Sequence, residues 1–202
     1  MVDRHKVLER RRSPLARLQD ELAGGSSAAV SLREIPFLAQ IGLRAVPGSA
    51  TSDGLADRLG GALPRQVGEV TTVRDGHQVL WLGPDEFLLI APDEADGGPE
   101  PAALVTELSD ALGNLPGQVV DLSANRTTLE LKGARAQDVL DKSCRLDLDE
   151  SAFPAGTAVA TLLGSVAVIL WRVDADTWRI LPRSSFAVHV ARWLLDGMRE
   201  FA

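Results

Sequence analysis

The sequence predicts an α+β fold in which antiparallel sheets carry their helices on one face. Three features of the 202 residues support this class. Short apolar runs with the length of strands flank tight turns, single amphipathic stretches follow groups of these runs, and this order occurs twice. A hydrophobic fraction of 45% and a charged fraction of 24% match ordinary globular proteins, so the chain can bury a sizeable core.

The first half is expected to hold strands followed by one helix. A short helix at 14–22 and a Gly-Ser linker at 24–27 precede the strands. The Gly-Pro-Asp sequence at 83–85 predicts a tight hairpin, because proline presets φ for the turn and Asp suits the next position. An amphipathic helix at 104–112 follows and stops at Gly113. The expected strands lie at 40–46, 66–73, 78–82 and 86–91.

The second half repeats this order. The block 119–133, VVDLSANRTTLELKG, holds two apolar runs around a polar string and stops at Gly133, which predicts a strand, a turn, a strand and a break. Ser184 or Ser185 can cap a final helix that continues to Phe201. The expected strands lie at 118–121, 127–131, 158–162, 166–173 and 178–181, with a helix at 134–142 between the second and the third.

Charge and composition exclude several classes. A net charge of −7 makes a nucleic-acid partner improbable for the body of the protein, since phosphate contacts need a positive face. No apolar run reaches the roughly 18 residues of a membrane span. A lone cysteine, Cys144, excludes an intramolecular disulfide, and the N-terminus has no apolar leader, so we expect a cytoplasmic protein.

One basic cluster stands apart from this acidic background, at the N-terminus. We expect this arm to be solvated or to dock on a partner subunit. A third interpretation has the arm bind nucleic acid or another anionic surface. The cluster comprises Arg4, Lys6, Arg10, Arg11, Arg12 and Arg17.

The chain offers no catalytic motif of a familiar kind. His5, His77 and His189 are far apart, so no metal site is expected. No glycine pair has the spacing of a phosphate-binding loop, and flavin or NAD would have to sit on another chain. The serines at 184–185 lack the Gly-x-Ser-x-Gly elbow, and helix capping explains them more simply.

The remaining candidates are four polar residues that follow a strand: Asp121, Ser123, Asn125 and Arg126. They could meet a ligand or a neighbouring subunit, with the arginine making a bidentate contact to a carboxylate. Alternatively, Asp121 and Ser123 bond nearby backbone amides and fix the turn. The sequence leaves both interpretations open.

Three blocks carry a family resemblance: VVDLSANRTTLELKG, WLGPDEFLLI and GTAVATLLG with WRILPRSS. Over roughly residues 12–195 they resemble the gamma subunit of heterotetrameric sarcosine oxidase, a relative of the folate-binding aminomethyltransferase domain. The resemblance implies two ferredoxin-like subdomains. It suggests an N-terminal arm at 1–30 and a domain at 31–202, with halves at 31–116 and 117–202.

The resemblance also implies a function without catalysis in this chain. In the folate-dependent relatives, acidic residues follow a strand like Thr161-Leu162-Leu163-Gly164, whereas Ser165 and Val166 stand here. The gamma subunit would brace alpha, beta and delta subunits that hold FAD, FMN, NAD and tetrahydrofolate and convert sarcosine to glycine, hydrogen peroxide and methylenetetrahydrofolate. The alternative is a stand-alone folate-binding one-carbon transferase or folate sensor, with folate on the four polar residues at 121–126.

Aromatic and arginine side chains are the expected anchors of a subunit contact, since they dominate interface hot spots. The tryptophans are ordinarily core residues, so a Trp found exposed beside Arg172, Arg179 or Arg183 would mark the interface. The interface candidates are Arg10, Arg11, Arg12, Arg172, Trp178 and Arg183.

Overall fold

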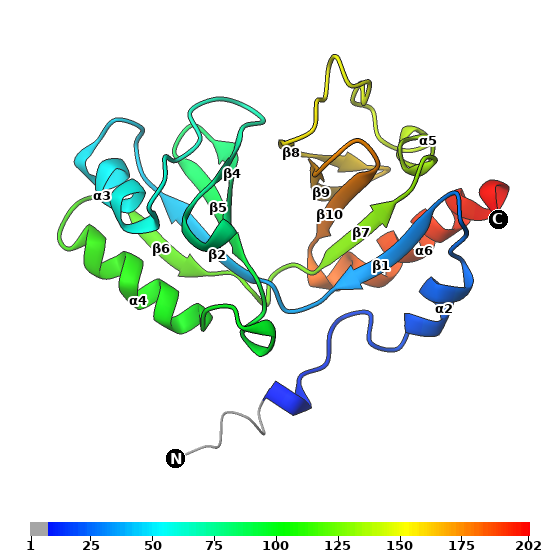
Figure 1. Ribbon diagram of the computed structural model, residues 1–202, viewed down its shortest axis with the longest axis horizontal. Coiled ribbons are helices and arrows are strands. Elements are labelled where there is room, and N and C mark those ends of the chain that lie inside the picture. Colours follow the sequence, from blue (N-terminus) through cyan, green and yellow to red (C-terminus); the bar gives the residue numbers. More distant parts are fainter. Residues whose placement is uncertain (1–7) are drawn as a thin grey trace.

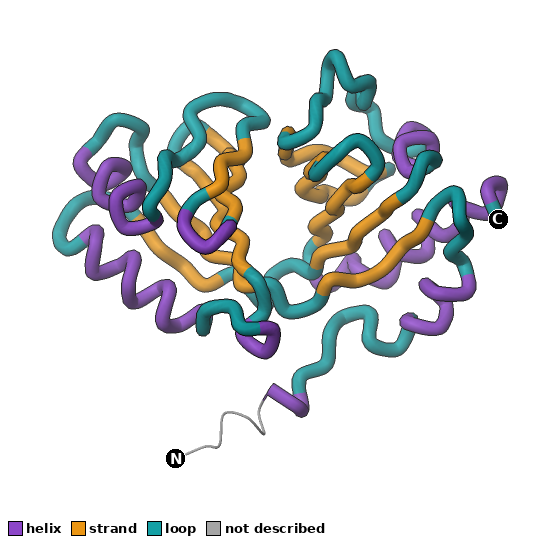
Figure 2. Tube along the Cα trace, viewed as in Figure 1, coloured by secondary structure: helices purple, strands orange, loops and turns teal. Residues whose placement is uncertain are grey.

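A computed structural model describes residues 8–202 of the protein. Two five-stranded antiparallel sheets face each other, and the helices cover their outer faces (Figures 1 and 2). The first sheet has the order β3-β4-β5-β2-β6 and the second β1-β7-β10-β9-β8. The expected α+β class, with helices on one face of each sheet, is confirmed.

The elements of the first sheet are β2 (Ala39–Arg44), β3 (Val70–Thr72), β4 (Gln78–Gly83), β5 (Glu86–Ala91) and β6 (Gln118–Asp121), with helices α3 (Ala50–Leu59) and α4 (Pro101–Leu112). The elements of the second are β1 (Ser31–Ile35), β7 (Thr128–Lys132), β8 (Thr157–Leu163), β9 (Val166–Arg172) and β10 (Thr177–Pro182), with helices α2 (Gln19–Gly24), α5 (Ala136–Asp141) and α6 (Ala187–Met198). Single 3-10 turns are η1 (Arg74–Gly76), η2 (Glu94–Asp96), η3 (Ser184–Phe186) and η4 (Arg199–Phe201).

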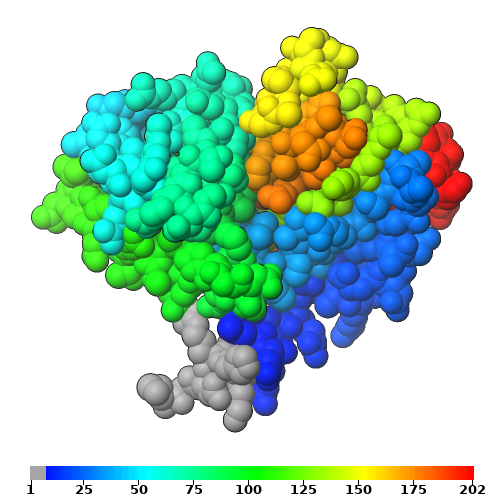
Figure 3. Space-filling view, in the orientation of Figure 1, coloured from blue at the N-terminus to red at the C-terminus, as the bar shows by residue number. Residues whose placement is uncertain are grey.

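Three apolar clusters hold these layers together. One lies between the first sheet and helices α3 and α4, and a second between the other sheet and helices α2, α5 and α6. The third lies between the two sheets, where Leu80 and Leu88 of the first sheet meet Ile169, Trp171 and Leu181 of the second. In Figure 3 the first-sheet segments and the β9–β10 hairpin meet along a seam.

The two sheets do not follow the expected boundary at residue 116. Strand β1 leaves the first half to pair with β7, and β6 leaves the second half to pair with β2. The chain therefore crosses between the sheets twice, at 36–38 and at 122–127. The expected halves were wrong in this respect, because strand pairing depends on contacts between segments distant in sequence.

The N-terminal segment is also part of the second sheet's core. Leu15, Leu18 and Leu22 are buried against it, so the expected separate arm at 1–30 is wrong for the stretch from residue 15 onward. The buried carboxylate of Glu34 accepts hydrogen bonds from Ser13 Oγ at 2.6 Å and from Thr127 Oγ1 at 2.6 Å. Arg4 and Lys6 of the basic cluster lie outside the described residues.

Most expected elements are confirmed within a few residues, and three differ. The expected helix at 14–22 begins at Gln19, after a turn in which Leu15 and Leu18 are buried. Strand β1 and helix α3 were not expected. In α3, Ser49 caps the first turn by accepting a hydrogen bond from the Ser52 N–H at 3.2 Å, but Gly54 and the polar run around it resemble a loop.

Strand β7 ends just before Gly133, where the backbone conformation and the close neighbours require glycine. Gly133 has φ 134°, and a Cβ there would lie 2.3 Å from the carbonyl oxygen of Ala29. Because neither backbone can move freely, we expect Gly133→Ala to lower the free energy of unfolding by about 2 kcal/mol or more. Urea unfolding of the variant and the parent protein measures this change in free energy. Gly24→Ala is the control, since nothing lies within 4 Å of its added Cβ, and an equal loss there would contradict the explanation.

Candidate functional site

The polar string after β6 forms the second crossover between the sheets. Asp121 Oδ1 accepts hydrogen bonds from the backbone N–H of Ser123 at 2.9 Å and from its hydroxyl at 2.6 Å. The Ser123 hydroxyl oxygen in turn accepts from the N–H of Gln40 at 3.0 Å. This chain of bonds ties the turn to the start of β2, as the backbone interpretation of Asp121 and Ser123 expects.

The next residues tie the crossover to the end of β10. Arg183 Nη1 donates to Asn125 Oδ1 at 2.9 Å, and the Ser184 N–H donates to the carbonyl of Asn125 at 2.9 Å. The carbonyl of Arg126 accepts from Gln40 Nε2 at 3.1 Å. Burial and the neighbouring charge of Arg183 lower the pKa of the half-buried Arg126 guanidinium.

These contacts do not favour a folate site at the four residues. Asp121, Ser123 and Asn125 use their side chains on the chain itself. The bonds to Asp121 and Ser123 satisfy the backbone N–H groups of Ser123 and Gln40. Arg126 is half-buried beside another cation, Arg183. The four residues therefore have a structural role in the crossover. Their polar groups are not arranged to bind the pterin and carboxylates of folate.

The structure separates the expected interface residues into three groups. Trp178 is fully buried, and Arg172 is 4% exposed and donates to the carbonyl of Phe153 at 2.9 Å, so these two expectations are wrong. Arg11 is bonded within the chain, to both carboxylate oxygens of Asp93 at 2.9 and 2.8 Å. The exposed candidates are Arg10, Arg12 and Arg183.

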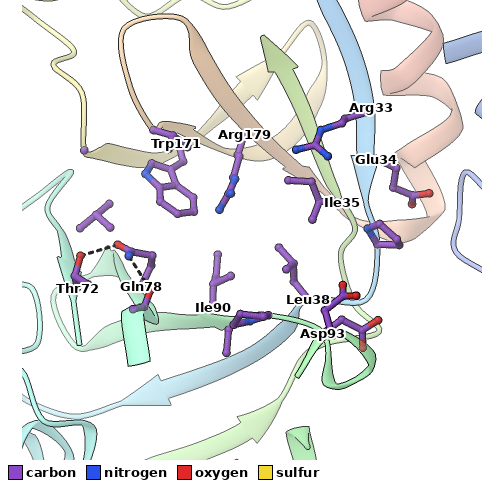
Figure 4. A pocket seen from close by; sticks show the side chains of 18 residues that line it. Arg33, Glu34, Ile35, Leu38, Thr72, Gln78, Ile90, Asp93, Trp171 and Arg179 are labelled. Carbon is purple, nitrogen blue, oxygen red and sulfur yellow. Dashed lines mark hydrogen bonds between the residues drawn. The ribbon is translucent and has the colours of Figure 1, made fainter. Parts of the chain in front are cut away.

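A second polar site, which the sequence did not reveal, lies between the sheets. It is a cavity of about 750 Å³ lined by both sheets and by the first crossover (Figure 4). A row of directly paired residues crosses four strands on this side of the second sheet: Arg33 on β1, Glu130 on β7, Arg179 on β10 and Trp171 on β9. Of these, Arg33, Arg179 and Trp171 line the cavity. Its size is that of a small-molecule pocket.

The charges in this row are unevenly paired. Glu130 is buried and lies 2.6 Å from Arg33 Nη2 and 3.8 Å from Arg179 Nε. Arg179 stacks on the indole of Trp171, with its guanidinium carbon 4.8 Å from the ring centre. Burial and the charge of Arg33 lower the pKa of Arg179, against the opposite effect of Glu130. The row brings two cations to one buried carboxylate.

Sequence reasoning missed this site because its members come from β1, β7 and the β9–β10 hairpin, which are far apart along the chain. Arg179 was noted only as a possible companion of an exposed tryptophan, and Arg33 lies in a strand that was not expected. The one local signal is the alternation in β10, where Trp178 and Ile180 face the helix side while Arg179 faces the cavity. Within residues 8–202, no group of three or more His, Cys, Asp or Glu side chains is placed to hold a metal ion.

The crossover contacts lead to a second prediction. Ser123→Ala removes the acceptor of the buried Gln40 N–H, so we expect the free energy of unfolding to fall by about 1–3 kcal/mol. Ser185→Ala, at an exposed position after β10, is the matched control and should change it by less than about 0.5 kcal/mol. Thermal and urea unfolding measure both variants. Equal stability of the two would show that the crossover does not depend on this bond.

The comparisons with known proteins agree with this architecture. The chain is 53% identical to the sarcosine oxidase subunit gamma of Arthrobacter sp over 193 residues, which is 95% of this chain and 92% of the relative. It is 51% identical to the subunit gamma of Corynebacterium sp. (strain P-1) over the same shares of the two chains. No helix in the described part of the chain is long and apolar enough to cross a membrane.

Two solved structures are similar as well. A chain of the heterotetrameric sarcosine oxidase from Corynebacterium sp. U-96 in complex with pyrrole 2-carboxylate matches at TM-score 0.86 and 48% identity, over 95% of this chain and 96% of that one. The aminomethyltransferase T of the glycine cleavage system from Bartonella henselae shares the fold at TM-score 0.64 and 16% identity, over 92% of this chain and 57% of that one. The model of the sarcosine oxidase gamma subunit family matches residues 46–200, and the chain belongs to this family.

Proposed function

We propose that this chain is the gamma subunit of a heterotetrameric sarcosine oxidase and that it braces the complex without taking part in the chemistry. The main support is the match to a chain of the Corynebacterium enzyme, which covers nearly all of both chains at 48% identity. In this proposal the partners are the alpha, beta and delta subunits. They hold FAD, FMN, NAD and tetrahydrofolate and convert sarcosine to glycine, hydrogen peroxide and methylenetetrahydrofolate.

The residues present support the absence of chemistry in this subunit. Where folate-dependent relatives are expected to carry an acid, Gly164 and Ser165 form the β8–β9 turn and Val166 is buried in the second sheet's core. A serine and a valine supply neither a general base nor a charge to stabilise a cation. The polar string at 121–126 is used in the crossover, which leaves a stand-alone folate transferase without its expected residues.

An exposed aromatic stripe on α6 is the surface we propose for the contact with a larger subunit. Trp193 is 49% exposed, and Phe186 and His189 precede it at helical spacing on the same face. The rings of His189 and Trp193 are 6.1 Å apart. Arg183 lies exposed just before this stripe, so the surface combines the aromatic and arginine side chains typical of interface hot spots.

The subunit proposal is tested by assembly. Genes for the four subunits are co-expressed with a tag on this chain, and in parallel with this chain omitted. We expect the tagged chain to recover a yellow complex that oxidises sarcosine, and the omission to give loss of assembled complex on size-exclusion chromatography. The purified chain alone should neither oxidise sarcosine nor carry flavin. Full assembly and activity without it would contradict the bracing role.

The docking surface is tested by a pair of variants on α6. Trp193→Ala should weaken assembly at least about tenfold, because truncating a central aromatic anchor commonly costs about 2 kcal/mol or more and a factor of ten is about 1.4 kcal/mol. Val188→Ala is the control, since Val188 is also exposed on α6 but at a different angle around the helix. Titration of the remaining subunits with each variant, followed by light scattering, measures the affinity. Equal affinities would place the contact elsewhere.

A further inference from the structure

We propose that the cavity between the two sheets binds a small carboxylic acid with an apolar body. Its carboxylate would lie on Arg179, with Arg33 beside it, and its body along the apolar wall of the first sheet and crossover (Figure 4). The site belongs to this chain alone and does not rest on the proposed place in an oxidase complex.

Arg179 is fixed in position, but not all of its hydrogen-bond donors have a partner. Its guanidinium stacks on Trp171, and its strand position pairs it directly with Glu130 and Trp171 on the two neighbouring strands. Its Nε is buried and has no hydrogen-bond partner among the described residues, and the nearest Glu130 oxygen is 3.8 Å away. A guanidinium offers five N–H donors, so this one retains donor capacity in a partly buried place.

Glu130 cannot neutralise both arginines. It lies close to Arg33, at 2.6 Å and 2.8 Å from two guanidinium nitrogens, and farther from Arg179. A single carboxylate between two cations leaves the row with one excess positive charge. Burial makes that charge costly unless an anion accompanies it, which is the condition for selective binding of a carboxylate.

The other acids of the cavity are paired, turned away or exposed. Asp93 is neutralised by Arg11, which binds both of its oxygens. Glu34 directs its carboxylate to Ser13 and Thr127, away from the cavity. Asp96 is exposed on the η2 turn and is solvated there. The positive charge is therefore concentrated at the Arg33–Arg179 end.

The rest of the wall suits an apolar body. Ile35 and Leu38 come from β1 and the first crossover, and Ile90 from β5 faces them (Figure 4). Gln78 and Thr72 are hydrogen-bonded to each other at 3.2 Å, so their polar groups are already used. An anionic end next to an aliphatic wall, in a cavity of about 750 Å³, fits a compact aromatic or branched carboxylic acid.

Benzoate is a suitable probe, and benzamide is its neutral counterpart of nearly the same shape. We expect isothermal titration of the full chain with benzoate to give one site per chain with a dissociation constant of about 1 mM, as a ligand of this size allows. Benzamide should bind at least about tenfold more weakly, because it lacks the charge-assisted bonds. Tryptophan fluorescence should change with benzoate, since Trp171 lies in the wall.

Variants then assign the site. Arg179→Gln should weaken benzoate binding about tenfold or more, and Arg58→Gln on the outer helix α3 should leave it unchanged. If Arg179→Gln does not fold, Arg33→Gln replaces it, because the Arg33 side chain is 70% exposed and its loss should be tolerated. No binding of benzoate, equal binding of benzamide, or an unchanged affinity in the folded arginine variant would each overturn the proposal.

Discussion

The apolar contact between the inner faces of the two sheets is the interaction on which the architecture depends. Each sheet already buries one face against its own helices, so without this contact the second face would remain in water. Leu88 and Leu181 belong to the cluster shared by the two sheets. Ile90 lies two residues from Leu88 on β5, Arg179 lies two residues from Leu181 on β10, and both line the cavity. Because side chains alternate with a period of two, the strands that close the sandwich also line its cavity.

The connections between the sheets hold the two inner faces against each other. The exchange of β1 and β6 means that neither sheet can form from one continuous half of the chain. The N-terminal segment adds a further link, since its leucines enter the second sheet's core while Arg11 binds Asp93 beyond the end of β5. Arg11 also lies over the ring of Phe37, in the first crossover, at 4.2 Å. The sheets are thus two layers of one folding unit.

Local signals predicted much of this fold, and non-local pairing explains what they missed. The Pro84-Asp85 turn and the strands beside it were expected because a two-residue hairpin is encoded by its own residues. Strand β1 was missed because it contains Glu34, whose burial depends on hydroxyl groups of Ser13 and Thr127. The capping serine and the left-handed Gly60 could have revealed α3, but Gly54 in its middle suggested a loop.

The same distinction separates the two polar sites. A chain that leaves one sheet for another loses its ladder partners, and here the short side chains of Asp121 and Ser123 accept from the backbone N–H groups of Ser123 and Gln40. In the sequence, such a group of polar residues resembles a binding site, although its hydrogen bonds are made within the chain. Arg33 and Arg179 show the reverse case. Arg33 stands beside Glu34 in β1 and Arg179 among apolar residues in β10. Only the register of β1, β7 and β10 places the two arginines around one carboxylate, where long side chains can still reach a ligand.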